Sequence, residues 1–132
     1  MTTTDRESEI AVTVPAEDVA CVAHAIRHHA RVALHNAQTD EGMPWDVGEI
    51  DQWIATLTEL RDHLVQLDRL PDDAVARLTF NLETLREIVA EMIQTGQRTI
   101  DVSRYPEDKE LGRSYLTAGR RLRDQLRRAA AA

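Results

Sequence analysis

Cysteine, aromatic residues, glycine and long apolar runs are all scarce in this sequence. The single cysteine, Cys21, excludes a disulfide within the chain. No apolar run approaches the roughly 20 residues of a membrane-spanning helix, and no signal peptide is recognisable, so we expect a cytoplasmic protein without membrane contact. The five glycines are scattered and form no phosphate-binding loop. Since no serine or cysteine stands in a nucleophile motif either, the sequence does not favour an enzyme.

Aromatic residues make up only 4% of the chain, whereas 42% of the residues are hydrophobic and 30% are charged. This is a globular composition in which Leu, Ile, Val and Ala must fill the core, and it favours helices. A length of 132 residues suits one domain. We expect residues 1–9 to form a disordered N-terminal tail and residues 10–132 to form a single helical-bundle domain.

The stretch from Trp45 to Gly96 predicts an antiparallel helical hairpin. Asp46 and Glu49 have the spacing of a capping box, which marks a helix start. Pro71 ends the first helix and suits the first turn of the second, and Gly96 suits a C-terminal cap. Apolar residues recur at steps of three and four along both predicted helices: Ile50, Trp53, Ile54, Leu57, Leu60, Leu64 and Leu67 in the first, and Val75, Leu78, Leu82, Leu85, Val89, Met92 and Ile93 in the second.

Two further helices are expected on either side of this hairpin. The first runs from about Pro15 to Ala37, and the last begins near Glu107, with acidic residues in its first turn. The predicted fold is therefore all-α, a four-helix bundle built on the central hairpin. Residues 10–14 and 99–103 both alternate in the manner of strands, so a minor two-stranded ribbon between them is possible.

A cluster of metal-ligand residue types lies on one side of the first predicted helix. Cys21, His24 and His28 are three to seven residues apart, and His63 from the next helix would complete a set of four. This spacing suits zinc, in a metal-binding bundle enzyme or a sensor. No cofactor is otherwise indicated, and a solvated His/Arg face is the plainer interpretation. Glu83, Glu87 and Glu91 form an acidic ladder that would bind a cation if it faced inward and would only aid solubility if it faced outward.

The net charge of -7 argues against general affinity for nucleic acid. The last 21 residues nevertheless carry six arginines and one aspartate. Such a basic helix contacts phosphates in some proteins, so nucleic-acid binding remains an alternative. Pairing with the acidic body, within a chain or between chains, is the simpler interpretation. The arginines of this basic patch are Arg113, Arg120, Arg121, Arg123, Arg127 and Arg128.

The first helix is apolar around most of its circumference, which predicts contacts on several sides. Together with the missing catalytic motifs, this favours a non-enzymatic protein-interaction or regulatory protein whose partner is a second copy, in a homodimer, or another protein. Phe80 lies off the main stripe of its predicted helix and suggests a second covered surface. The residues predicted for the interface are Val22, Ile26, His29, Ala33, Phe80 and Leu122.

Overall fold

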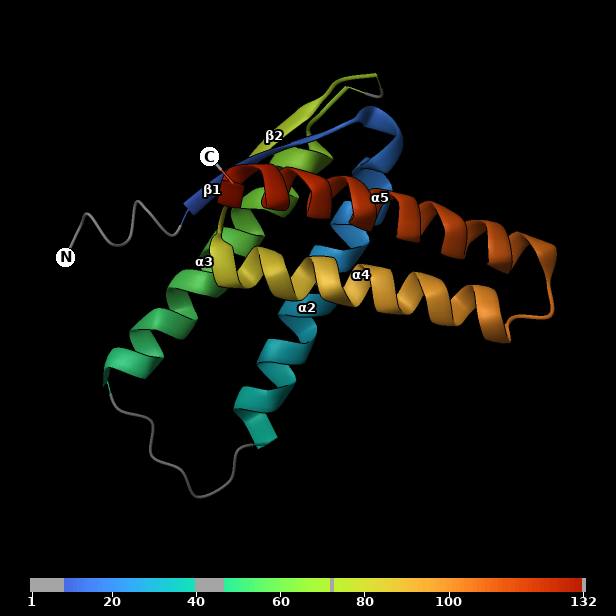
Figure 1. The fold of residues 1–132 in the computed structure, drawn as a ribbon. Coiled ribbons are helices and arrows are strands. Elements are labelled where there is room, and N and C mark those ends of the chain that lie inside the picture. The colour runs from blue at the N-terminus through green and yellow to red at the C-terminus, as the bar shows by residue number, and fades with distance from the viewer. Residues whose placement is uncertain (1–8, 40–46, 72, 132) are drawn as a thin grey trace.

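The computed structural model describes residues 9–39, 47–71 and 73–131 (Figure 1). The described residues form four α-helices and two strands, and a strand precedes each pair of helices, which differs from the predicted order. The elements are β1 (Glu9–Val14), the 3-10 helix η1 (Ala16–Asp18), α2 (Val19–Thr39), α3 (Val47–Asp68), β2 (Ala76–Asn81), α4 (Leu82–Val102) and α5 (Pro106–Ala131). The prediction of four helices is confirmed. The predicted tail lies outside the described residues except for Glu9, with which β1 begins.

β1 and β2 form a two-stranded antiparallel sheet in which Val12 pairs with Leu78. Both strands alternate strictly between buried and exposed side chains. Because successive side chains of a strand point to opposite faces, one face of the sheet covers the core and the other meets solvent. The inward-facing side chains are Ile10, Val12, Val14, Ala76, Leu78 and Phe80.

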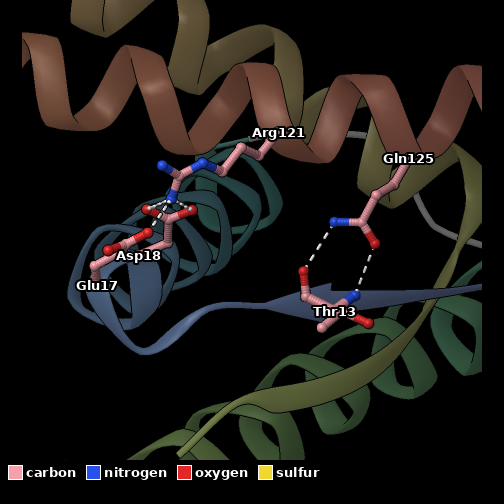
Figure 2. A network of polar contacts seen from close by, with 5 residues as sticks. All are labelled: Thr13, Glu17, Asp18, Arg121 and Gln125. Carbon is pink, nitrogen blue, oxygen red and sulfur yellow. Dashed lines mark hydrogen bonds and ion pairs between the residues drawn. The ribbon is translucent and has the colours of Figure 1, made fainter. Parts of the chain in front are cut away.

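Side chains from two helices close both outer edges of this small sheet. The Gln125 amide of α5 accepts from the Thr13 N–H and donates to the Thr13 carbonyl, both at 2.8 Å, and so replaces a neighbouring strand (Figure 2). On the other edge, the Gln66 amide of α3 donates to the Arg77 carbonyl at 2.9 Å. Since two strands alone are only marginally stable, these contacts and the buried face hold the sheet in place.

The prediction of a helix from Pro71 to Gly96 is wrong for its first part, because residues 76–81 form the strand β2. Val75 and Leu78 therefore do not belong to a helical stripe. The helix starts later, where the Asn81 side chain accepts from the backbone N–H groups of Glu83 and Thr84. An asparagine cap of this kind satisfies donors that the first helical turn leaves free. β2 thus separates α3 from α4, and the hairpin expected between them does not form.

The helical hairpin of this fold is instead formed by α4 and α5, which lie side by side (Figure 1). Gly96 was predicted to cap a helix, but it lies inside α4, which continues to Val102. A Cβ atom at Gly96 would be 2.8 Å from both the Gly112 carbonyl oxygen and the Leu116 nitrogen. Gly96 is therefore needed for the close approach of two backbones. Gly112 and Gly119 have the same role on α5.

The predicted two-stranded ribbon and the predicted bundle are each confirmed only in part. A minor two-stranded sheet exists, but residues 99–102 end α4, so β1 has β2 as its partner. α2 and α3 cross the α4–α5 hairpin rather than run along it (Figure 1). The expected bundle on an α3–α4 hairpin is thus replaced by a crossed arrangement. The Asp46 cap lies outside the described residues, and α3 begins directly after it.

One core joins the inner face of the sheet to all four helices. Leu60 of α3 and Leu85 of α4 are fully buried in it, whereas Leu57 and Leu82 are only partly buried. None of the described helices is long and apolar enough to cross a membrane.

Candidate functional site

The histidines of α2 meet the acidic ladder of α4. His28 Nε2 lies 2.7 Å from Glu91 Oε1, and His29 Nε2 lies 3.4 Å from Glu87 Oε2. His29 Nδ1 is also 4.0 Å from the second Glu91 oxygen. Glu87 and Glu91 thus connect α4 to α2. Neither an inward-facing cation site nor a purely solvent-facing ladder describes them. Glu83, the third member, pairs with Arg86 on its own helix at 3.2 Å.

Tyr115 of α5 extends this contact to a third helix. Its hydroxyl lies 3.1 Å from His24 Nδ1, and the two rings meet edge to face. Burial, followed by the charges of Glu91 and Cys21, raises the pKa of Tyr115 to about 12. The phenol therefore stays neutral and serves as a hydrogen-bonding group at physiological pH.

The residues predicted to bind zinc are not brought together. Cys21, His24 and His28 lie on α2, whereas His63 lies on α3 against Phe80, with ring centroids 4.4 Å apart. Within residues 9–39, 47–71 and 73–131, no group of three or more His, Cys, Asp or Glu residues could hold a metal ion. Burial and the nearby charge of Asp18 raise the pKa of the Cys21 thiol, which disfavours the thiolate that metals bind.

The buried Nε2 atom of His63 has no hydrogen-bond partner among the described residues. The nearest carboxylate, Glu59, is 3.6 Å away and accepts the Asn81 N–H at 3.1 Å. The His63 side chain is 10% exposed. Its ring packs beside Phe80, and the described part of the chain leaves this buried nitrogen without a hydrogen bond, which costs stability.

One arginine of the basic patch, Arg121, connects the last helix α5 to the 3-10 helix η1 near the start of the chain. Arg121 Nη1 donates to Glu17 at 2.8 Å and to both oxygens of Asp18 at 2.9 and 3.0 Å (Figure 2). These bonds, foremost the one to Asp18, raise the pKa of Arg121 further above its usual range. The Asp18 side chain is buried, so α5 supplies the charge that this carboxylate needs.

The remaining arginines of the patch lie along one side of α5, since Arg113, Arg120 and Arg127 are seven residues apart and share one face of the helix. Arg113 and Arg121 line an open groove of 260 Å³ together with Glu17, Asp18 and Glu110, so acidic groups interrupt the basic surface there. Arg123 lies 3.9 Å from Asp124. Arg120, Arg127 and Arg128 are exposed. Basic side chains thus predominate on this side of α5, with acidic residues beside them near Arg113, Arg121 and Arg123.

Most residues predicted for an interface belong to the core of the chain itself. Val22, Ile26, Phe80 and Leu122 are buried within the single chain, because Phe80 faces inward from β2 and the other three face the sheet and its neighbouring helices. His29 pairs with Glu87, and Ala33 is partly buried. Much of the apolar surface of the first helix is therefore buried within the chain, although Val32 is 41% exposed.

The three most exposed large apolar side chains of the described residues lie at the free end of the α4–α5 hairpin, while Val32, Ile54, Val65 and Val75 are exposed elsewhere. We call residues 97–114 the arm, and it stands clear of the sheet, α2 and α3 (Figure 1). Val102 ends α4, Tyr105 lies in the connecting turn and Leu111 lies in the second turn of α5, with exposed fractions of 71%, 64% and 61%. We call these three residues the apolar strip. Exposed apolar side chains thus lie where the sequence did not predict an interface.

Comparison with known proteins does not assign the chain to a family. No protein-family model, curated protein or solved structure matches the chain. The function must therefore be argued from the geometry of this chain alone.

Sequence reasoning misses several residues that organise these surfaces. It gives Gly96 the role of a cap and Gly112 no role, although a small residue inside an amphipathic helix can also signal close packing. Leu111 shares the apolar period of the last helix, which predicts that it is buried. The pattern gives no sign that the elements packed against α5 nearer the body do not extend as far as Leu111. Gln125 carries no recognisable signal.

Proposed function

We propose that this chain is a non-enzymatic protein-interaction module that docks through the apolar strip of its arm. The observation that carries the proposal is the exposure of Val102, Tyr105 and Leu111 together on a projecting element. These three are the most exposed of the seven large apolar side chains that are exposed among the described residues. Exposed apolar groups gathered in one place are typical of interaction surfaces. The partner is a protein met in the cytoplasm, and no cofactor is required.

The chemistry of the polar clusters supports this proposal. The His28–Glu91 and Arg121–Asp18 pairs hold helices together, and the Tyr115 phenol and the Cys21 thiol both have raised pKa values. A raised pKa makes a nucleophile or base less available near neutral pH. These groups stabilise the platform from which the arm projects.

Site-specific photocrosslinking in living cells tests the proposal even though the partner is unidentified. A benzophenone amino acid replaces Tyr105 in the arm, and in a matched control it replaces Arg120, which is exposed on α5 nearer the body. We expect a discrete product of higher mass from position 105 and none from position 120. No product from the arm, or equal products from both positions, would refute the proposed docking surface.

A further inference from the structure

The last helix, α5, packs along two flanks and leaves a third side to solvent. Arg121 bonds to η1 on one flank, and Gly119 touches α4 on the other (Figure 2). At 3.6 residues per turn, Arg113, Arg120 and Arg127 lie between these flanks, and all three are exposed. We call this third side of α5, between residues 109 and 128, the basic face.

The arginines of the basic face repeat at a constant interval. Arg113, Arg120 and Arg127 are seven residues apart, which at a rise of 1.5 Å per residue places them about 10 Å apart along the helix. Because α5 is a single helix, these three positive charges form a row of about 21 Å. A partner that carries a row of negative charges matches this arrangement.

The chain itself does not neutralise these arginines. Ion pairs of the described residues involve four arginines, namely Arg61, Arg86, Arg121 and Arg123. Arg113, Arg120, Arg127 and Arg128 form none within the described part of the chain, although the chain as a whole has a net charge of -7. A guanidinium group offers parallel N–H donors that match two oxygens of a phosphate or a carboxylate. These four arginines are therefore available to an anionic partner.

The other side chains of the basic face favour the backbone of a double-stranded nucleic acid as that partner. They are polar without exception: Lys109, Glu110, Thr117 and Asp124. A helix that binds a membrane surface inserts apolar side chains, and the centre of a protein interface is apolar as well. Proteins that bind single strands stack the bases on aromatic residues, which this face lacks. Arginine and hydroxyl groups, by contrast, are usual contacts of duplex phosphates.

The charge of the basic face makes such binding local and sensitive to salt. Five basic residues against Glu110 and Asp124 give this side of α5 a net charge of +3. At physiological ionic strength, charges more than about 8 Å apart are largely screened, so the acidic remainder of the chain weakens the attraction without abolishing it. Affinity that comes from phosphate contacts falls steeply as salt is added.

We propose that the basic face of α5 binds the phosphate backbone of a double-stranded nucleic acid without reading its base sequence. This activity goes beyond the protein docking proposed for the arm. Leu111 of the apolar strip precedes Arg113 by two residues and so lies nearly on the opposite side of α5. The two surfaces can therefore be occupied at the same time.

Fluorescence anisotropy of a labelled DNA duplex of mixed sequence, titrated with the full chain at several salt concentrations, tests the proposal. Four arginine contacts predict that log affinity falls against log salt with a slope of about -3.6. Arg120→Gln and Arg127→Gln should each weaken binding about fivefold and reduce the slope by about 1. Asp124→Asn removes a negative charge from the face and should strengthen binding.

Arg61→Gln is the matched control, because it removes an exposed arginine from α3 and changes the net charge equally. It should leave the affinity unchanged, and circular dichroism confirms that every variant is folded. No binding of the duplex at about 50 mM salt, or binding that is insensitive to Arg120→Gln and Arg127→Gln, overturns the proposal. Equal or tighter binding of the single strand, of phosphatidylserine vesicles or of polyglutamate overturns the choice of a duplex.

Nuclease treatment separates this test from the crosslinking experiment, in which position 120 is the control. A nucleic-acid adduct at position 120 disappears after nuclease treatment, whereas a crosslinked protein persists. Duplex binding without a protein product from position 105 refutes the docking role of the arm alone. A protein product from position 105 without duplex binding refutes the role of the basic face alone.

Discussion

The phenol of Tyr115 shows how one buried side chain reports on the packing of three helices. Its pKa is raised to about 12, first by burial and then by the charges of Glu91 and Cys21. In the unfolded chain a tyrosine ionises near its ordinary value of about 10. Because the folded state disfavours the phenolate, the stabilisation that Tyr115 contributes is complete below about pH 10 and is lost as the pH rises towards 12.

Alkaline titration checks this shift directly. Tyr105→Phe leaves Tyr115 as the single tyrosine, and its tyrosinate absorbance should appear with a midpoint near pH 12 in the folded protein and near pH 10 in urea. The free energy of unfolding should fall over the same interval. A midpoint near 10 in the folded protein would show that Tyr115 is not packed between α2, α4 and α5.

Leu85 distinguishes the observed core from the one predicted. Leu85→Ala should lower the free energy of unfolding by about 2 to 5 kcal/mol, because the fully buried side chain leaves a cavity. Leu82→Ala should cost clearly less, since Leu82 is only partly buried at the start of α4. Urea denaturation of the two variants measures the difference, and equal losses would contradict the position of β2 and the start of α4.

The α4–α5 hairpin depends on a glycine at the point where its two backbones are closest. Gly96→Ala should raise helix propensity by about 1 kcal/mol, but its methyl group would meet the Gly112 oxygen and the Leu116 nitrogen at 2.8 Å. These are backbone atoms that can move only if the helices separate, and such overpacking costs about 1 to 3 kcal/mol. We therefore expect a net loss of stability and a lower melting temperature.

Gly119→Ala is the natural comparison for this hairpin. Its added methyl group would lie 3.0 Å from the Met92 Cβ and 3.1 Å from the Ile93 side chain, so the contact is less severe than at Gly96. The loss at Gly119 should be the smaller of the two. If Gly96→Ala stabilised the protein, the close approach of α4 and α5 would be wrong.

The whole chain is tied together where its beginning meets its last helix. Arg121 of α5 binds Glu17 and Asp18 of η1, and Gln125 one turn later closes the edge of β1 (Figure 2). Arg121→Met would leave the buried Asp18 carboxylate without its cation. We expect a lower melting temperature for Arg121→Met than for Arg120→Met, which removes an exposed arginine with no such partner among the described residues. Equal melting temperatures would show that the Arg121 contacts contribute nothing to stability.

The helical segments of this protein can be predicted from local pattern, because an amphipathic helix and its caps are encoded within a few consecutive residues. α2, α3 and α5 lie close to their predicted positions for this reason. The prediction fails for residues 76–81 because Leu78 also fits a helical stripe with Val75 and Leu82, although Ala76, Leu78 and Phe80 alternate as in a strand. The alternation of this segment and the Asn81 cap are the signals in the sequence that mark the true boundary.

Which segments touch lies beyond local pattern, since contacts depend on residues far apart in the chain. β1 pairs with β2 across more than sixty residues, and the Glu87 and Glu91 carboxylates find their partners on α2. The same apolar period covers Leu111 and Leu122, yet only Leu122 is covered by other elements. Periodicity says that a side of a helix is apolar, whereas burial depends on how far the neighbouring elements extend, and that difference leaves the arm bare.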